Sequence, residues 1–233
     1  MKIVLIGYGK MGHMIEGVAR ERGHEIVGVI DPTLRMDDCV LAIDFDSDAF
    51  RSADVAIEFT TPATARENIL RAWAQSVPVV CGTTGWDAQE LLEEDKRLHT
   101  KPMLVWKSNF SVGVNIFFEL NKFLAEKILQ SAADYQPSIK EIHHIHKLDA
   151  PSGTAKSMAE IVAEHLGVRP DITSIREGEV PGTHVVKFKS EVDKIKVSHE
   201  AFSRQGFAEG AVVAAQMTEG LTGVHTFKEL IIK

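Results

Sequence analysis

Short apolar segments alternate with helix-like segments along the first half of the chain. Strands are predicted at residues 2–6, 25–30, 55–59, 77–81 and 103–106, and helices after residue 12, at 62–75 and at 87–98. In the first helix, Met14, Ile15 and Val18 have the spacing of one helix face. Strands that alternate with helices favour a parallel sheet with helices on both faces. The pattern predicts an α/β fold of the Rossmann type with a doubly wound parallel sheet.

The second half of the chain has a different order of elements. Helices are predicted at 114–130, 155–166 and 207–217, and strands at 138–144, 184–190 and 194–199. Residues 169–183 are polar and contain two prolines and two glycines, so we predict a long loop there. Residues 226–232 are predicted to form a helix end or a short strand. This order predicts a second, mixed α/β domain.

The first predicted strand ends in a Gly-x-Gly-x-x-Gly motif that comprises Gly7, Tyr8, Gly9, Lys10, Met11 and Gly12. The motif follows a strand, opens a helix and precedes a second strand, as dinucleotide-binding turns do. Gly7 permits a tight turn, Gly9 lets the backbone approach a pyrophosphate, and Gly12 allows close helix–sheet packing. A plain glycine turn is the alternative. The motif predicts a dinucleotide with its phosphates at the helix N-terminus.

Asp31 ends the second predicted strand, about twenty residues after the glycine motif. An acidic side chain at this place usually hydrogen-bonds the adenosine ribose, although a turn aspartate before Pro32 is the alternative. A 2′-phosphate would set a second anion against Asp31, so we expect NADH to be preferred. NADPH stays possible, because Arg35 could fold back and bind the phosphate.

A segment from Glu141 to Thr154 concentrates reactive side chains: Glu-Ile-His-His-Ile-His-Lys-Leu-Asp-Ala-Pro-Ser-Gly-Thr. Ser152, Gly153 and Thr154 lie at a predicted helix N-terminus, where N–H groups and hydroxyls can bind a carboxylate. Lys147 could add a positive charge, and the histidines before it could donate protons. The segment predicts a site that holds a small acidic substrate and protonates it.

Other roles are open for these histidines. Because side chains alternate along a strand, we expect His144 and His146 on one face and His143 on the other. A strand histidine is often structural, and neighbouring histidines could ligate zinc. However, no cysteine lies near them, no His-x3-His pair exists, and Lys147 would repel a cation. We therefore expect no metal.

Composition narrows the class of protein. The chain of 233 residues has a net charge of −7 and no basic run, so nucleic acid is not an expected partner. Its 44% apolar content is enough for buried cores, but no apolar segment is long enough to span a membrane. Cys39 and Cys81 lack the spacing of a disulfide framework. We expect a protein of the reducing cytoplasm, without a targeting segment.

The histidine segment resembles a known family. His-His-x-x-Lys followed by Asp-Ala-Pro-Ser-Gly-Thr-Ala is similar to the signature of the dihydrodipicolinate reductase family, also called 4-hydroxy-tetrahydrodipicolinate reductase. Gly-Thr-Thr-Gly at 82–85 and the segments 107–115 and 176–184 are similar to other elements of that family. The resemblance covers nearly the whole chain and is weakest at the shortened region 31–52.

The resemblance implies a dinucleotide-binding domain of residues 1–111 plus 205–233 and an inserted substrate-binding and oligomerisation domain of residues 112–204. It also implies hydride transfer from NADH or NADPH to dihydrodipicolinate, a small dicarboxylate, or to its hydrated precursor. The product would be tetrahydrodipicolinate, an intermediate of lysine (diaminopimelate) biosynthesis. The assembly would be a homotetramer joined through the sheets of the second domain.

Individual roles follow from the resemblance. His143 and Lys147 match the family's proposed proton donors, while His144, Gly153 and Thr154 match its substrate-binding residues, with Ser152 completing the helix N-terminus. The further cofactor contacts that it implies are Gly82, Thr83, Thr84, Lys107, Ser108, Asn109 and Phe110. A cyclic imine dicarboxylate does need a hydride, a proton and cations or N–H dipoles for its carboxylates.

Two other functions stay open from the sequence. The chain could be another two-domain dehydrogenase that acts on an amino-acid-derived acid. It could also be a non-catalytic protein that binds a dinucleotide and reports the redox state.

Overall fold

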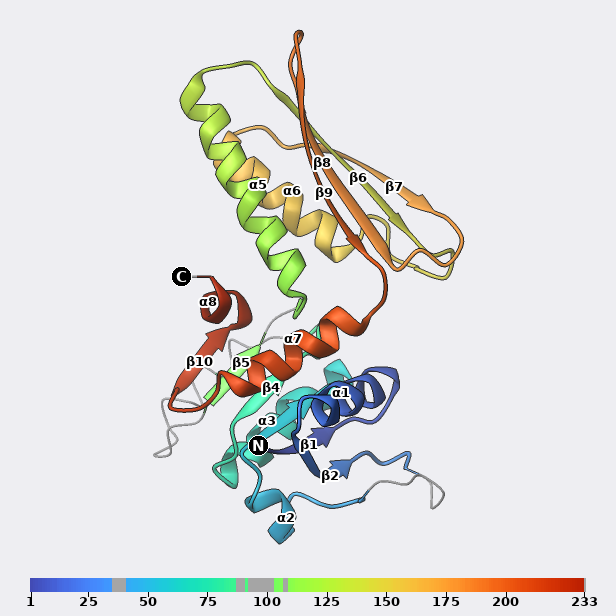
Figure 1. The fold of residues 1–233 in the computed structure, drawn as a ribbon, viewed down its shortest axis with the longest axis vertical. Coiled ribbons are helices and arrows are strands. Elements are labelled where there is room, and N and C mark those ends of the chain that lie inside the picture. Colours follow the sequence, from blue (N-terminus) through green and yellow to red (C-terminus); the bar gives the residue numbers. More distant parts are fainter. Residues whose placement is uncertain (35–40, 87–90, 92–102, 107–108, 233) are drawn as a thin grey trace. The chain divides into compact units, whose positions relative to one another are not determined.

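The computed structural model describes residues 1–34, 41–86, 91, 103–106 and 109–232. The chain divides into two compact units (Figure 1). Unit 1 comprises Met1–Ser111 and Phe207–Lys233, and unit 2 comprises Val112–Gly206. Among the described residues, no helix is long and apolar enough to cross a membrane.

Unit 1 is an α/β domain. Its elements are β1 (Lys2–Ile6), α1 (Lys10–Glu21), β2 (Glu25–Ile30), α2 (Asp48–Arg51), β3 (Val55–Glu58), α3 (Pro62–Ala74), β4 (Val79–Cys81), β5 (Met103–Trp106), α7 (Gln205–Gln216), β10 (Gly223–Thr226) and α8 (Phe227–Ile231). The strands form one parallel sheet in the order β10-β5-β4-β3-β1-β2. The direction of winding reverses between β1 and β3, which confirms the predicted doubly wound sheet. Ligands bind at the carboxyl ends of the strands at such a switch point.

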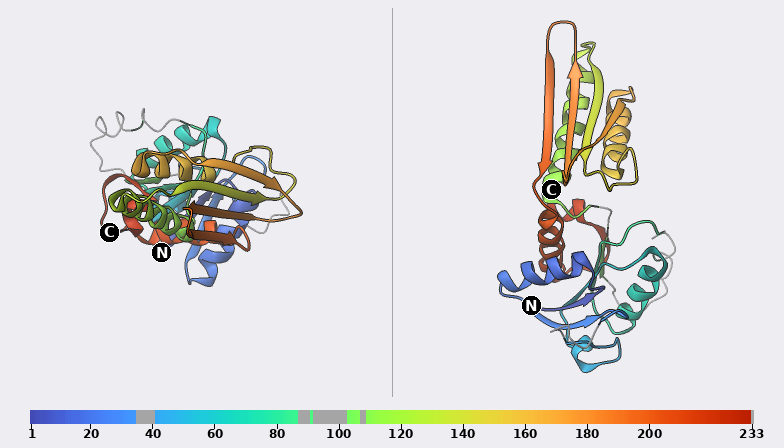
Figure 2. Two further views of the ribbon diagram at one scale, coloured as in Figure 1. Left: turned by 90° about the horizontal axis from the view of Figure 1, so that it is seen from above. Right: turned by 90° about the vertical axis from the view of Figure 1, so that its right-hand side faces the viewer.

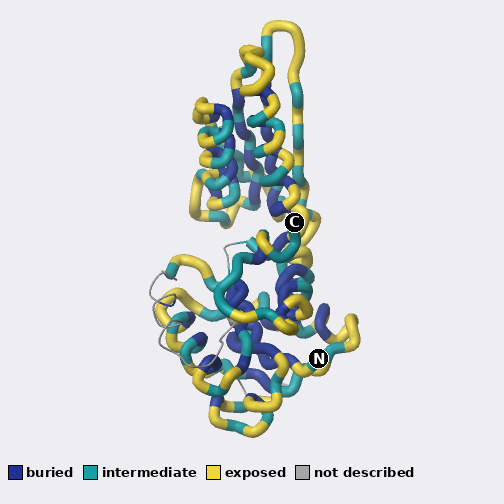
Figure 3. Tube along the Cα trace, turned by 90° about the vertical axis from the view of Figure 1, so that its left-hand side faces the viewer, coloured by how far each residue is buried: buried dark blue, intermediate teal, exposed yellow. Residues whose placement is uncertain are grey.

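The central strands β1, β3 and β4 are buried on both faces, and this explains why they are largely apolar runs. Ile3 and Leu5 face a core formed with α1 and α7, whereas Val4 and Ile6 face a core formed with α3. The buried parts of the trace accordingly lie inside the unit (Figure 3). Alternate residues of one strand therefore stabilise two separate layers of helices.

The C-terminal segment completes unit 1. β10 pairs in parallel with β5, and the buried alanines of α7 join the core on the α1 side. A Cβ at Gly210 would stand only 1.6 Å from the carbonyl oxygen of Phe110. The Phe110 ring in turn packs on Phe227, with 5.1 Å between centroids. Glycine at position 210 thus lets α7 approach the backbone that follows β5.

Unit 2 is a mixed α/β domain. Its elements are α5 (Val112–Ser131), β6 (Gln136–His143), α6 (Gly153–Leu166), β7 (Asp171–Arg176), β8 (Gly182–Lys189) and β9 (Lys194–Ala201). The sheet order is β7-β6-β8-β9, with β6 and β7 parallel and the other pairs antiparallel. Phe117 and Met158 of the two helices pack on Ile139 and Val186 of the sheet. The β8–β9 hairpin extends beyond these helices (Figure 2).

Several sequence predictions are corrected here. The loop predicted at 169–183 is wrong, because β7 lies within it. Among the described strands, β7 at the sheet edge pairs only with β6, and glycines and prolines on both sides made its sequence resemble a loop. The strand predicted at 138–144 ends at His143, so strand alternation does not extend to the later histidines. β10 and the short α2 were not predicted, and the helix predicted at 87–98 lies outside the described residues apart from Leu91.

Candidate active site

The glycine motif forms the turn between β1 and α1. Gly7 has φ +93°, and a Cβ there would stand 2.2 Å from the Phe59 carbonyl oxygen. A Cβ at Gly12 would stand 2.5 Å from the Gly7 carbonyl oxygen, so Gly12 packs within the turn itself. A Cβ at Gly9, the N-cap of α1, would meet no other atom within 4 Å. The open space over Gly9 at a helix N-terminus suits a pyrophosphate.

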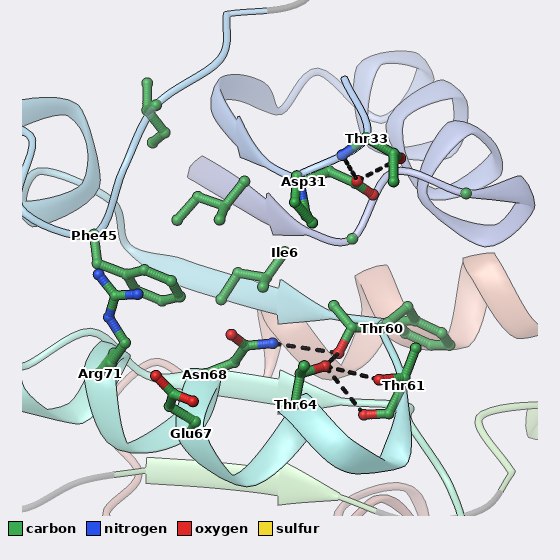
Figure 4. A pocket seen from close by; sticks show the side chains of 16 residues that line it. Ile6, Asp31, Thr33, Phe45, Thr60, Thr61, Thr64, Glu67, Asn68 and Arg71 are labelled. Carbon is green, nitrogen blue, oxygen red and sulfur yellow. Dashed lines mark hydrogen bonds between the residues drawn. The ribbon is translucent and has the colours of Figure 1, made fainter. Parts of the chain in front are cut away.

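A pocket lies at the carboxyl ends of β1, β2 and β3, beside the switch point (Figure 4). Of the predicted cofactor residues, Gly7, Gly9 and Asp31 line it. Tyr8, Lys10, Met11 and Gly12 belong to the same turn without lining the pocket.

One wall of this pocket was not predicted. It is formed by Thr64, Glu67, Asn68 and Arg71 of α3. The Arg71 guanidinium lies over the Phe45 ring, 4.1 Å from its centroid. The signal in the sequence was the spacing of these polar residues, which places them on one face of the helix.

Asp31 is held by backbone groups of the turn. Its Oδ2 accepts the Tyr8 N–H at 2.6 Å, and its Oδ1 accepts the Thr33 N–H at 2.8 Å and the Thr33 hydroxyl at 2.6 Å. Partial burial opposes ionisation, but these hydrogen bonds outweigh it and lower the pKa of Asp31. The pocket therefore presents a fixed negative charge at the end of β2.

The Gly-Thr-Thr-Gly loop is tied to the end of β3. The Thr60 N–H donates to Thr83 Oγ1 at 2.8 Å, and the Gly82 N–H donates to the Glu58 carbonyl at 2.9 Å. A Cβ at Gly82 would stand 2.0 Å from the Phe59 ring. Gly82 and Thr83 thus have packing roles besides any cofactor contact, whereas Thr84 is exposed.

Glu58 is a buried residue beside this loop that sequence reasoning missed. Its carboxyl group accepts the Thr60 hydroxyl and the Cys81 thiol, the latter at 2.9 Å. Burial, followed by the nearby Glu58 carboxyl group, raises the pKa of Cys81 well above its usual value. The thiol is therefore a hydrogen-bond donor here and not a nucleophile.

The remaining predicted cofactor residues lie after β5. Asn109 Oδ1 accepts the Ser111 N–H at 2.9 Å. Phe110 is buried and its side chain belongs to the core of unit 1, so the structure gives it a packing role. Lys107 and Ser108 lie outside the described residues.

In unit 2, Glu141 and His143 lie on one face at the end of β6. Glu141 Oε2 is 2.8 Å from His143 Nδ1, and both side chains are buried. Glu141 Oε1 contacts the Arg176 guanidinium at 3.1 Å and accepts the Ser152 N–H at 3.2 Å. Burial opposes ionisation of Glu141, but the hydrogen bonds from Ser152, Ser174 and Arg176 lower its pKa to about 2. Glu141 is therefore ionised at neutral pH.

His184 of the adjacent strand β8 lies beside His143, with 5.0 Å between the ring centroids. Burial, helped by His143, lowers the pKa of His184 to about 4. The pKa of His143 is also lowered, because burial, Lys147 and Arg176 outweigh the attraction of Glu141. Both imidazoles are therefore neutral at neutral pH.

The predicted anion site at the start of α6 is adjacent to these histidines. Ser152 is the N-cap, its Oγ accepting the Ala155 N–H at 3.2 Å and lying 3.3 Å from His184 Nε2. Gly153 is exposed and Thr154 half-buried in the first turn. His144 is half-buried in the residues that follow β6.

Lys147 lies in the loop between β6 and α6. Its Nζ is 2.7 Å from Asp149 Oδ1, and its side chain is 24% exposed. The hydrogen bond from Lys147 and the N–H of Gly153 lower the pKa of Asp149. Arg176 donates to the carbonyls of Lys147 and Asp149, so it fixes this loop. A substrate carboxylate would compete with Asp149 for the same donors.

The arrangement of unit 2 can bind an anion and exchange a proton beside it. Sequence reasoning identified the donors but not their supports, Glu141, Arg176 and His184. Glu141 and His143 are two residues apart on a strand, which indicates a common face. The contacts of Arg176 and His184 depend on strand register, which the sequence did not reveal.

Comparison with known proteins identifies the family. Family models described as "Dihydrodipicolinate reductase, N-terminus" and "Dihydrodipicolinate reductase, C-terminus" match residues 1–110 and 113–231. The 4-hydroxy-tetrahydrodipicolinate reductase of Christiangramia forsetii is 41% identical over 99% of this chain and 98% of the relative. That of Staphylococcus haemolyticus is 34% identical over 99% of this chain and all of the relative.

Solved structures agree in fold. The dipicolinate-bound dihydrodipicolinate reductase of Paenisporosarcina sp. TG-14 has a TM-score of 0.79 at 23% identity, with 97% of each chain covered. Since two family models together match nearly the whole chain and full-length relatives exceed 30% identity, this chain belongs to the dihydrodipicolinate reductase (4-hydroxy-tetrahydrodipicolinate reductase) family of oxidoreductases.

Proposed function

We propose that this protein reduces dihydrodipicolinate, or its hydrated precursor, to tetrahydrodipicolinate in lysine and diaminopimelate biosynthesis. The observation that carries the proposal is the juxtaposition in unit 2 of a proton-exchanging His143, the cationic Lys147 and the N-terminus of α6. The substrate is a small dicarboxylate that needs N–H dipoles and a cation for its carboxylates and a proton at one ring atom.

The pocket of unit 1 fits a nicotinamide dinucleotide. Gly9 leaves space at the N-terminus of α1 for phosphates, and Asp31 lies where a ribose hydroxyl can donate to it. When bound, the reduced dinucleotide supplies the hydride. The residues of this chain hold and orient it, and in unit 2 Lys147, His144, Gly153 and Thr154 bind the substrate at the helix N-terminus that Ser152 completes, while His143 donates the proton.

A direct test uses enzymatically generated dihydrodipicolinate. We expect absorbance at the reduced-nicotinamide band to fall on its addition, with formation of one tetrahydrodipicolinate for each coenzyme oxidised. Oxidation of a different amino-acid-derived acid without turnover of dihydrodipicolinate would favour another dehydrogenase. Dinucleotide binding without any turnover would favour a redox sensor.

The coenzyme preference is a separate prediction. We expect NADH to have about a tenfold higher kcat/KM than NADPH, equivalent to about 1.4 kcal/mol. The ionised Asp31 would repel a 2′-phosphate. Arg71 lies in the same pocket, but its guanidinium face is already packed against the Phe45 ring, so we do not expect it to offset this repulsion. The specificity constants for both coenzymes, measured at low ionic strength, decide this.

A matched variant separates charge from shape. Asp31→Asn keeps an acceptor for Tyr8 and removes the negative charge, so the preference for NADH should shrink. An equal or higher kcat/KM for NADPH in the parent would refute the argument, and loss of that activity in Arg35→Ala would identify the responsible cation. The homotetramer, which the family resemblance implies, and the cytoplasmic location, which the composition indicates, remain predictions.

A further inference from the structure

The carboxylate of Glu141 is surrounded by groups from the start of α6, from β7 and from its own strand. One oxygen, Oε1, accepts from Ser152 at the start of α6 and from Arg176 of β7. The other, Oε2, is 2.8 Å from His143 Nδ1. Both atoms are buried and neither has another hydrogen-bond partner among the described residues, so each is the partner available to the other. Glu141 therefore connects the histidine, the anion-binding turn and the arginine that fixes the Lys147 loop.

This arrangement determines which ring nitrogen of His143 carries the proton. An ionised carboxylate can only accept, so Nδ1 must be the protonated nitrogen when the imidazole is neutral. The exchangeable nitrogen is then Nε2. Gly182 leaves room on that side of the ring, because a Cβ at this position would stand 3.1 Å from Nε2.

A divalent cation is the competing explanation for this cluster. Atoms of Glu141, His143 and His184 lie within 4.8 Å of one another, and two histidines with one glutamate suit zinc. However, the Arg176 guanidinium occupies one oxygen of the carboxylate at 3.1 Å, and a second cation, Lys147, lies in the adjoining loop. A proton shared by Glu141 and His143 explains the 2.8 Å contact between them. A divalent cation at the same place would lie close to the positive charges of Arg176 and Lys147.

We propose that Glu141 is a positioning residue for this reaction, which holds His143 in the Nδ1–H tautomer so that Nε2 takes up and donates the substrate's proton. The role in turnover rests on the proposed function. The tautomer itself does not, because it is a property of the substrate-free protein. A carboxylate that orients a catalytic imidazole has the same role in hydrolytic triads.

Other charged groups also act on His143. Lys147 and Asp149 from the following loop, Arg176 from β7 and His184 from β8 influence it along with Glu141. Their contributions remain when Glu141 is replaced. A comparison of Glu141 variants at fixed surroundings therefore isolates the effect of the carboxylate.

The first test is nuclear magnetic resonance of the full-length protein with ¹⁵N-labelled histidine, without substrate. We expect His143 at neutral pH to have a protonated Nδ1 and an unprotonated Nε2. In Glu141→Gln, the amide oxygen should turn toward Arg176 and Ser152, leaving the NH₂ group to face Nδ1. Nδ1 must then accept, so the proton should move to Nε2.

The second test is the pH dependence of turnover. A histidine that acts as an acid loses activity as pH rises through its pKa. In Glu141→Gln this descending limb should move to lower pH, and kcat should fall by about ten- to a hundredfold, as for other partners that orient a functional imidazole. Glu141→Asp keeps the charge and should recover part of the rate together with the Nδ1–H tautomer.

Several outcomes would overturn the proposal. One is an Nε2–H tautomer in the parent protein, and another is an unchanged tautomer and pH profile in a folded Glu141→Gln. If Glu141→Gln does not fold, Glu141→Asp is the remaining test. An Nε2–H tautomer in Glu141→Asp, together with an unchanged pH profile, would then count against the proposal. Stoichiometric zinc in the purified parent, bound through His143 and His184, would replace the proton explanation with a metal site. Failure to reduce dihydrodipicolinate with the expected tautomer present would refute only the proposed function.

Discussion

Replacing Lys147 with alanine is expected to lower kcat/KM for dihydrodipicolinate by about ten- to a hundredfold. A charge-assisted hydrogen bond to a carboxylate contributes about 1.5–3 kcal/mol, and this converts directly into that loss of rate. In the absence of substrate the same ammonium group contacts Asp149. That pair is partly exposed, so its loss should change the stability of the fold by less than about 1 kcal/mol.

The measurement is steady-state kinetics at saturating and at limiting substrate, together with urea unfolding of each variant. Lys156→Ala is the matched control, because Lys156 is exposed on the first turns of α6 and its loss should leave turnover unchanged. Activity of Lys147→Ala within twofold of the parent under both conditions would refute the assignment of Lys147 to the substrate.

The free energy of unfolding of unit 2 is expected to fall by about 3 kcal/mol between pH 6.5 and pH 4 through His184 alone. In the folded protein the pKa of His184 is about 4, whereas its ordinary value is 6.5. Between these values the unfolded chain binds a proton on His184 that the folded chain does not. Protonation therefore favours unfolding, and stability that is fully present above pH 6.5 is lost as pH falls.

Urea unfolding, followed through the methyl signals of Val186 in β8, reports on unit 2 separately. His184→Gln should lose much of the dependence on pH between 6.5 and 4, whatever its stability at pH 7. His146→Gln, at a histidine whose side chain is 68% exposed, should retain the parent's dependence. Parallel pH curves for His184→Gln and the parent would contradict the prediction.

The sequence predicted the fold of unit 1 better than that of unit 2. β1, β3 and β4 are buried on both faces, so each is a largely apolar run that composition alone reveals. β7 and β10 were missed because most of their residues are polar or glycine and are only partly buried. Edge strands need fewer apolar side chains, and β7 has glycines and prolines nearby that indicate loops.

The candidate site was predicted where it is continuous in sequence. His143, Lys147 and Ser152 lie within one segment, and the N-cap at Ser152 agrees with the predicted helix N-terminus. Arg176 and His184 come from separate strands and reach Glu141 and His143 through the pairing of β6 with β7 and β8. Register of this kind depends on packing across the whole sheet and is not encoded in any local motif.

The return of the C-terminal segment into unit 1 affects the order in which the protein is made. Residues 112–206 form a continuous unit, so they can fold as soon as they leave the ribosome. Until Phe207–Lys233 has been synthesised, the sheet of unit 1 lacks β10. The face of the sheet that carries Ile3 and Leu5 also lacks the covering helix α7. Unit 1, whose first strands are synthesised before unit 2, is thus the later of the two units to be completed, and its apolar face stays uncovered on the nascent protein until then.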